Sequence, residues 1–248
     1  MDPTSYRPIC LLPILGKSLE RMLLLRLQYH YSKNNILSEN QYGFRQNIST
    51  EHALSNLIEN INTNRANNLY TCIISIDIKG AFDSLWWPSI ITRLKKDNCP
   101  EDILSMICSY LDTREIEYKM ADTKINHHLQ KGCPQGSCLG PFLWTIISNT
   151  ILKEDWGNHC QLQAFADDFI IIIKSQNRRQ LEDQASKALQ KFKEWTANEK
   201  LTLSHNKTQA IVFGKKGQIK KRKPTIKFQN WKVEIKKYPQ IPRNNNRL

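Results

Sequence analysis

The sequence has no run of 18 apolar residues, so we predict no membrane span. Its N-terminus, MDPTSYRPIC, lacks the basic and then apolar segments of a secretory signal. The seven cysteines are odd in number, scattered, and form no CxxC pair. This pattern indicates reduced thiols rather than a disulfide framework or a zinc site. Together these absences predict an intracellular protein that does not enter a membrane.

Acidic residues are scarce at the C-terminal end of the chain. The formal net charge is +13, which favours a polyanionic partner. Residues 215–248 hold 12 Lys and Arg residues and one acid, Glu234, so the other 214 residues carry only about +2. A nucleic-acid groove in the body must therefore come from local placement of basic side chains. The basic tail either contacts phosphates or is a solvated end of the chain.

Apolar periodicity predicts an α+β fold with helices packed on one face of an antiparallel sheet. The expected helices cover residues 17–31, a segment that begins after Ser49, a segment from Asp83 or Ser84 to Lys96, residues 100–111, a segment that ends near Leu152, and residues 180–200. The expected strands cover residues 70–78, the two arms of 161–174, and 208–213, with a hairpin over 115–130. The second helix should bury one apolar face, formed by Ala53, Leu54, Leu57, Ile58 and Ile61.

Three acids stand at positions where an apolar strand should not tolerate them. Asp77 interrupts the run IISIDI, and Asp167 and Asp168 lie between AFA and FIIII. A buried carboxylate is costly unless it is paired, hydrogen-bonded or bound to a cation, and oxygen ligands suit Mg²⁺. Two such ions can activate an attacking hydroxyl and stabilise a leaving pyrophosphate. The alternatives are an ordinary Asp-Asp hairpin turn and an edge-strand aspartate.

The motifs SIDIKGAFDSL (75–85), KGCPQGSCLGP (131–141) and AFADD (164–168) resemble, in order and spacing, the A, B and C motifs of reverse transcriptases. The segments SYRPICLLPILGKSLERM (5–22) and SENQYGFR (38–45) look like the upstream finger motifs. The segment GAFDSLWWPSIITRL is similar to the corresponding segment of jockey-like and type-1 arthropod elements, which belong to the LINE-like non-LTR retrotransposons. The resemblance covers residues 5–213. It implies an RNA-directed DNA polymerase that adds dNTPs to a DNA primer 3′-OH on an RNA template, with the nucleus as the expected location.

The resemblance also implies a right-hand polymerase with fingers and a palm. The expected divisions are fingers over 1–69, the first part of the palm over 70–95, a helix and hairpin over 96–130, the second part of the palm over 131–214, and a basic tail with an incomplete thumb connection over 215–248. The resemblance assigns two Mg²⁺ ions, which Mn²⁺ could replace, to the carboxylates of Asp77, Asp167 and Asp168 and the backbone carbonyl of Ile78. Lys207 resembles the motif D lysine that would protonate pyrophosphate; an ordinary surface lysine is the alternative.

Further residues are implied to contact the nucleotide. Phe82 occupies the position of the sugar gate, where a ring would clash with a ribose 2′-OH, or it is simply a core residue. Gln135 and Gly136 lie in the loop that would approach the template or nucleotide, although a Gly/Pro loop before a helix explains them equally. Arg7 and Arg45 are both candidates to grip the triphosphate, and the sequence does not choose between them. Asp83 is expected to cap its helix.

Downstream the chain departs from the family. Residues 225–233, TIKFQNWKV, look like the strands that lead to the primer grip, but the Tyr-Leu-Gly element expected near Tyr238 is replaced by KKYPQIPRNNNRL. We therefore expect an incomplete copy. The alternatives to an active enzyme are a truncated element that only grips nucleic acid and an inert relic. An RNA polymerase is disfavoured by Phe82 and by AFADD.

Overall fold

The structure, a computed structural model, describes residues 12–112, 114–120, 123–215, 224–228 and 231–236. Within them, a five-stranded sheet has the order β4-β5-β1-β6-β9, and all neighbours are antiparallel except β6 and β9. The strands of this sheet are β1 (Tyr70–Ile76), β4 (Cys160–Phe165), β5 (Asp168–Ser175), β6 (Gln209–Phe213) and β9 (Glu234–Ile235). Two separate hairpins are formed by β2 (Glu115–Met120) with β3 (Thr123–His128), and by β7 (Lys227–Phe228) with β8 (Trp231–Lys232).

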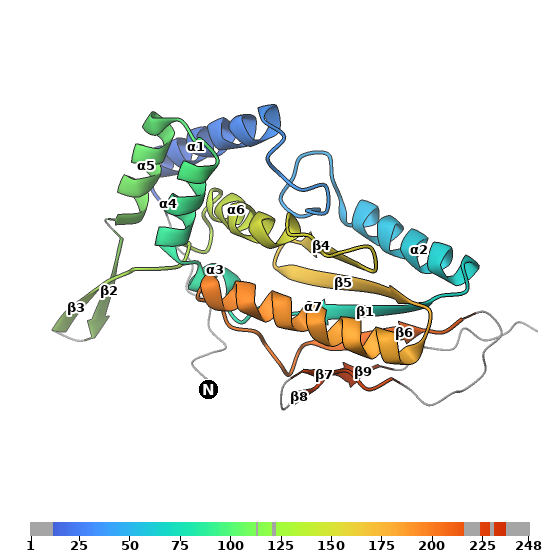
Figure 1. Ribbon diagram of the computed structural model, residues 1–248. Helices are drawn as coiled ribbons and strands as arrows, with labels where there is room; N and C mark the ends of the chain where they lie inside the picture. Colours follow the sequence, from blue (N-terminus) through green and yellow to red (C-terminus); the bar gives the residue numbers. More distant parts are fainter. Residues whose placement is uncertain (1–11, 113, 121–122, 216–223, 229–230, 237–248) are drawn as a thin grey trace, which may run out of the picture.

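The described residues also form seven helices (Figure 1). They are α1 (Ile14–Lys33), α2 (Thr50–Ala66), α3 (Ala81–Ser84), α4 (Trp87–Lys96), α5 (Glu101–Asp112), α6 (Gly140–Leu152) and α7 (Arg178–Asn198). Of these helices, α2, α6 and α7 contact this sheet. α7 runs along the sheet, and α4, α5 and α6 gather with α1 at one end of it (Figure 1). The predicted α+β class with an antiparallel sheet is confirmed. None of the described helices has the length and apolar character that a membrane crossing requires.

The core lies between the central strands and α6 and α7. β1 and β5 are rich in β-branched residues, which suits strands that are covered by other elements. Phe169 is fully buried, and its ring centroid lies 5.0 Å from that of Phe192, 5.7 Å from that of Trp195 and 6.4 Å from that of Trp144. Such edge-to-face aromatic packing adds to the free energy gained by burial. This core fixes the sheet end that carries the predicted carboxylates.

Three sequence predictions about elements need correction. The helix expected from Asp83 or Ser84 to Lys96 is two helices, α3 and α4, with Leu85 and Trp86 between them. Pro88 explains the break, because it has no N–H to donate to the carbonyl of residue 84 in a continuous helix. The first strand ends at Ile76 rather than at residue 78.

The third incorrect prediction is that α2 buries its whole apolar face. Of the five apolar residues expected to be buried, only Ala53 is buried, and Leu54 and Ile58 are both 55% exposed. α2 contacts β1, β4 and β5, and Leu57 and Ile61 are half-buried, so only the part of the apolar face formed by Leu54 and Ile58 is left uncovered. The hydrophobic spacing predicted the helix but not the side on which its neighbours lie.

Several expectations lie outside the described residues. They include Arg7 and the first part of the upstream finger motif, Tyr238, and most of the basic tail. The predicted hairpin over 115–130 is confirmed as β2 and β3, and it projects from the body (Figure 1). The six described cysteines are free thiols, as predicted.

Candidate active site

The register of β1 and β5 brings two of the predicted carboxylates to one place. Ile76, the last residue of β1, pairs with Phe169 of β5. One step further along this antiparallel register sets Asp77 opposite Asp168. Ile76 and Phe169 both point into the core, with exposed fractions of 1% and 0%, so their neighbours Asp77 and Asp168 project from the other face of the sheet. The two carboxylates therefore share a face.

Asp167 lies in the turn between β4 and β5. Phe165 pairs with Asp168, which leaves Ala166 and Asp167 as a two-residue turn. Ala166 has φ +58, the positive value that the first central residue of a tight hairpin turn adopts. The sequence prediction placed the turn on the Asp-Asp pair, whereas Asp168 already belongs to β5. The third acid is thus adjacent to the corner that Asp77 and Asp168 form.

The segment Asn40–Gly43 forms hydrogen bonds with the end of β4, next to the β4–β5 turn. The amide of Tyr42 donates to the carbonyl of Ala164 at 2.8 Å, and the amide of Ala164 donates to the carbonyl of Asn40 at 2.9 Å. Trp144 Nε1 donates to the carbonyl of Ala166 at 2.9 Å. These bonds fix the backbone on which Asp167 stands.

Charge is concentrated at this corner. The pKa of Asp168 is raised, first by partial burial and then by the neighbouring carboxylates of Asp167 and Asp77. The ammonium group of Lys207 acts in the opposite direction, and its Nζ lies 3.5 Å from Asp77 Oδ2. Mutual repulsion among the three acids is the condition under which a bound cation lowers the free energy most.

The donor set at this corner fits a hard divalent cation. Its side-chain donors are carboxylate oxygens, the ligands that Mg²⁺ prefers. As the side chains stand, no three acidic, histidine or cysteine residues within the described ranges are close enough to hold a metal ion. Asp77 Oδ2 instead forms an ion pair with Lys207. The corner therefore has suitable ligands on neighbouring strands, but their side chains are not arranged around a common point.

The hydrogen bonds of its neighbours show where the backbone carbonyl of Ile78 points. The carbonyl of Asp77 accepts from the amide of Ser204 at 2.9 Å, and the amide of Lys79 donates to the carbonyl of Thr202 at 2.8 Å. Polar groups of successive residues point to opposite edges of an extended chain. The carbonyl of Ile78 therefore faces away from the 202–204 segment, towards the side on which β5 lies.

Phe82 is half-buried in a row of aromatic rings. Its centroid lies 6.1 Å from that of Phe44 and 6.0 Å from that of Trp144. Its backbone carbonyl accepts from the amide of Cys133 at 2.9 Å. Phe82 thus packs against the core while part of its ring stays accessible, which is compatible with both roles that the sequence left open.

Gln135 and Gly136 lie in the loop between β3 and α6. Gly136 has φ +100 and Gly132 has φ +89, values that favour glycine. Gln135 Nε2 lies 3.4 Å from Asp83 Oδ1. The expectation that Asp83 caps a helix is wrong: the N-cap positions of α3 and α4 are Gly80 and Trp86, and Asp83 lies within α3, where its carboxylate faces Gln135.

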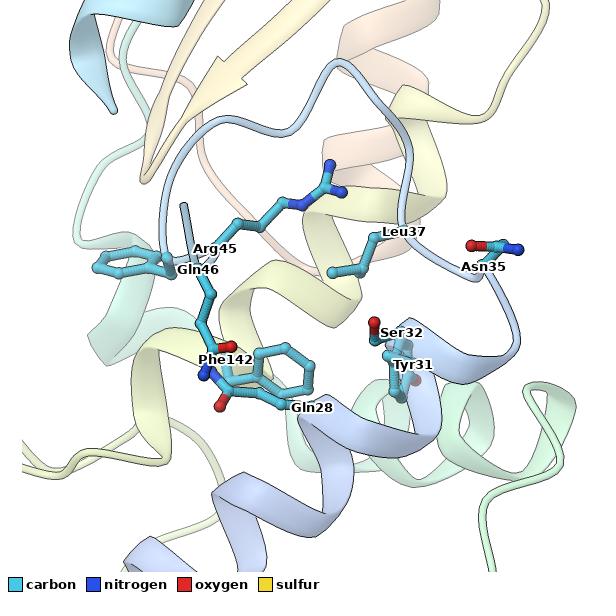
Figure 2. Close-up of a pocket in the computed structure, with 9 residues that line it drawn as sticks. Gln28, Tyr31, Ser32, Asn35, Leu37, Arg45, Gln46 and Phe142 are labelled. Carbon is cyan, nitrogen blue, oxygen red and sulfur yellow. The ribbon is translucent and has the colours of Figure 1, made fainter. Parts of the chain in front are cut away.

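Arg45 folds back on its own loop. Its Nη1 donates to the carbonyl of Ser38 at 2.8 Å and to that of Gln41 at 3.3 Å. The side chain extends into the space that the loop encloses, beside a pocket also lined by Leu37 and Phe142 (Figure 2). In this arrangement Nη1 of Arg45 holds the 38–41 backbone through these two hydrogen bonds. Arg7, the other candidate, lies outside the described residues.

Sequence reasoning missed residues whose importance depends on distant partners. Gln41 is fully buried, and its Nε2 donates to Ser148 Oγ at 2.8 Å. Gly43 lies so close to the turn that an added Cβ would stand 2.0 Å from the Ala166 nitrogen. The motif SENQYGFR contains both residues, but the contact of Gln41 with α6 and the contact of Gly43 with the β4–β5 turn appear only in the structure.

The model of the family described as "Reverse transcriptase (RNA-dependent DNA polymerase)" matches residues 1–236. A putative 115 kDa protein in type-1 retrotransposable element R1DM of Drosophila melanogaster is 31% identical over 230 residues, which are 92% of this chain and 21% of that protein. The Pol polyprotein from type-1 element R1 of Bradysia coprophila is 32% identical over 236 residues, 95% of this chain and 23% of that protein.

The solved structures include similar folds. Telomerase from Candida tropicalis, in complex with a fragment of telomeric RNA, superposes with a TM-score of 0.60 and 16% identity over 81% of this chain and 34% of that one. At this identity the likeness concerns the fold alone. The chain spans about a fifth of the length of the two retrotransposon proteins.

Proposed function

Because the chain belongs to the reverse transcriptase (RNA-dependent DNA polymerase) family, we propose that it forms the fingers and palm of an RNA-directed DNA polymerase. The observation that carries the proposal is the corner where the register of β1 and β5 sets Asp77 opposite Asp168, beside the turn residue Asp167. The palm is then built from residues 70–95 and 131–214, the fingers from residues 1–69, and the 96–130 segment lies between the two parts of the palm.

Asp77, Asp167 and Asp168, with the carbonyl of Ile78, would hold the divalent ions, which we propose are two Mg²⁺ with Mn²⁺ as a substitute. When bound, such ions make the primer 3′-OH more nucleophilic and neutralise charge on the leaving pyrophosphate. The protein supplies oxygen ligands on two strand ends that the core holds rigidly. Rigid placement is the main contribution that a protein makes to phosphoryl transfer.

Lys207 is proposed to donate a proton to the departing pyrophosphate. Its Nζ lies 3.5 Å from Asp77 Oδ2 and its side chain is 73% exposed, so it can exchange the carboxylate for a phosphate oxygen as the site fills. General acids placed in this way contribute about 10²–10⁴-fold to a rate. This role would couple Lys207 to the same carboxylate that binds metal.

The remaining contacts concern the nucleotide and the template. The accessible part of the Phe82 ring would exclude a ribose 2′-OH, and Gln135 and Gly136 would approach the template–nucleotide base pair. Arg45 could reach a triphosphate with the part of its guanidinium that does not bond Ser38 and Gln41, and Arg7 remains the other candidate. RNA template, DNA primer and dNTPs are the proposed partners, and the nucleus is the proposed location.

Primer extension tests the proposed function. The full chain is mixed with poly(rA)/oligo(dT), dTTP and Mg²⁺, and incorporation is followed with and without EDTA. We expect metal-dependent incorporation that Asp167→Ala abolishes, with a loss of at least about 10³-fold. RNA binding without any incorporation, in Mg²⁺ or Mn²⁺, would instead favour a module that grips nucleic acid and does not polymerise.

A further inference from the structure

α1 contains a buried carboxylate that is not one of the proposed metal ligands. Glu20 is only 3% exposed, although it lies on a helix with many exposed neighbours. A buried carboxylate is costly unless donors satisfy both of its oxygens. Its placement therefore requires partners from other parts of the chain.

Those partners come from α5 and from the loop before α6. Glu20 Oε1 accepts from the hydroxyl of Tyr110 and from Ser137 Oγ at 2.9 Å. Glu20 Oε2 accepts from the amide of Cys138 at 3.1 Å, and the Cys138 thiol lies 3.7 Å from the same oxygen. Burial and this hydrogen bond to Glu20 raise the pKa of Tyr110, so the phenol stays protonated and remains a donor. Both carboxylate oxygens are thus occupied.

Ser137 links Glu20 to the start of α6 through hydrogen bonds. Its Oγ donates to Glu20 and accepts from the amides of Leu139 and Gly140, both at 3.1 Å. These amides belong to the N-cap residue and the first residue of α6, where backbone donors lack partners within the helix. Glu20 therefore orients the hydroxyl that completes the start of α6, and with it the C-terminal end of the loop.

The other end of the same loop is anchored separately. The amide of Gly132 donates to the carbonyl of Leu85 at 2.7 Å, and the amide of Cys133 donates to that of Phe82 at 2.9 Å. Trp87 Nε1 donates to the carbonyl of Gly132 at 2.8 Å. Gln135 and Gly136 lie between these two anchored ends, and both ends are needed to define where they stand.

We propose that Glu20 is a positioning residue, which fixes the loop of residues 134–138 so that Gln135 meets the template–nucleotide pair in one orientation. This inference rests on the proposed polymerase function for its consequence, but its structural part stands by itself. Replacing one of the two carboxylate oxygens of Glu20 with an amide group should loosen the loop and misplace Gln135. It leaves the proposed metal ligands unchanged. Misplacement of a contact group by about 1 Å can cost on the order of 10²-fold in rate.

The test uses the full chain with Glu20→Gln, Tyr110→Phe and the control Glu59→Gln, which changes an exposed carboxylate of α2 in the same way. Glutamine offers one acceptor and one amide donor, so either Cys138 or the Tyr110–Ser137 pair meets a donor instead of an acceptor. Tyr110→Phe removes one donor and leaves the others, and it serves if Glu20→Gln does not fold. Two measurements are made: amide hydrogen exchange of residues 131–140, and the KM and kcat for dTTP together with misinsertion frequency.

We expect exchange in this loop to rise at least about tenfold in Glu20→Gln, less in Tyr110→Phe and not in Glu59→Gln. The KM for dTTP and the misinsertion frequency should rise in the same order, with KM increasing about tenfold in Glu20→Gln. Unchanged loop exchange in Glu20→Gln would overturn the proposal, whether or not the chain polymerises. Raised exchange with unchanged KM and fidelity would also overturn it. Absence of incorporation by the unaltered chain counts against the polymerase proposal alone, because the exchange measurement still decides whether Glu20 holds the loop.

Discussion

Asp77 illustrates how much a single residue can indicate. It follows β1, in which residues 71–74 and Ile76 are buried and Ser75 is exposed, and the strand ends one residue before it. Its carboxylate contacts Lys207, and its carbonyl binds the amide of Ser204. One residue thus connects the strand end, the 202–204 segment and the proposed general acid.

Phe82 carries a prediction about sugar selectivity. Replacing it with alanine removes the ring that would clash with a 2′-OH, so incorporation of ribonucleotides relative to deoxyribonucleotides should rise by about 10²-fold. The measurement is single-nucleotide primer extension with UTP and dTTP in parallel. Phe82→Tyr is the matched variant, because it keeps the ring.

Phe82→Tyr should retain the selectivity against UTP. If Phe82→Ala extends with dTTP and discriminates against UTP as strongly as the unaltered chain, Phe82 is a packing residue. Its contacts with Phe44 and Trp144 would then be its whole role. A fall in both rates at a constant ratio would have the same meaning.

Some of the candidate site residues can be found from the sequence alone, whereas others can be found only once the fold is known. The three aspartates could be singled out as candidates because a charge inside an apolar run is a local anomaly. Glu20 was not, because a glutamate in a surface-like helix is unremarkable until Ser137, 117 positions away, is brought against it. The helix-capping role expected of Asp83 was wrong, because α3 begins earlier and is only four residues long.

At the scale of elements, helices and strands were largely predictable, whereas their partners were not. The β-branched runs predicted β1, β5 and β6, and the apolar spacing predicted α1, α2 and α7. The apolar face of α2 was assigned to the interior, but Leu54 and Ile58 remain exposed. Periodicity defines a face, and only long-range packing decides whether that face is covered.

The contact between the 40–43 segment and the β4–β5 turn gives a prediction about two elements. Gly43→Ala would place a Cβ 2.0 Å from the Ala166 nitrogen and 2.7 Å from its Cα, both backbone atoms that cannot rotate away. The segment or the turn must shift, which should destabilise the fold by about 1–3 kcal/mol. Because Asp167 follows Ala166 directly, kcat should also fall about tenfold or more.

Urea unfolding and primer extension measure these two effects. Gly214→Ala is the control, since no atom lies within 4 Å of its added Cβ. Equal stability and kcat for Gly43→Ala and Gly214→Ala would mean that the segment does not hold the turn. Loss of stability with normal kcat would mean that the segment supports the fold but does not determine where Asp167 lies.

At the scale of the whole molecule, the strand order could not have come from local patterns. β1 lies between β5 and β6, which follow it in the chain by about a hundred residues or more. Nothing in the composition of these strands specifies that order, and the motif resemblance supplied only the expectation that Asp77 shares a site with Asp167 and Asp168. The register that results is what brings Asp77 to Asp168.

The proposed polymerase function depends on metal binding at this corner. Mn²⁺ is paramagnetic and can replace Mg²⁺ at oxygen sites, so its binding to the full chain can be followed by electron paramagnetic resonance in the presence of dTTP. We expect saturable binding that Asp77→Asn and Asp167→Asn each weaken at least about tenfold, while Glu59→Gln leaves it unchanged. Mn²⁺ binding that is absent in the unaltered chain, or equally strong in all four proteins, would contradict a shared metal site at the end of β1 and β5.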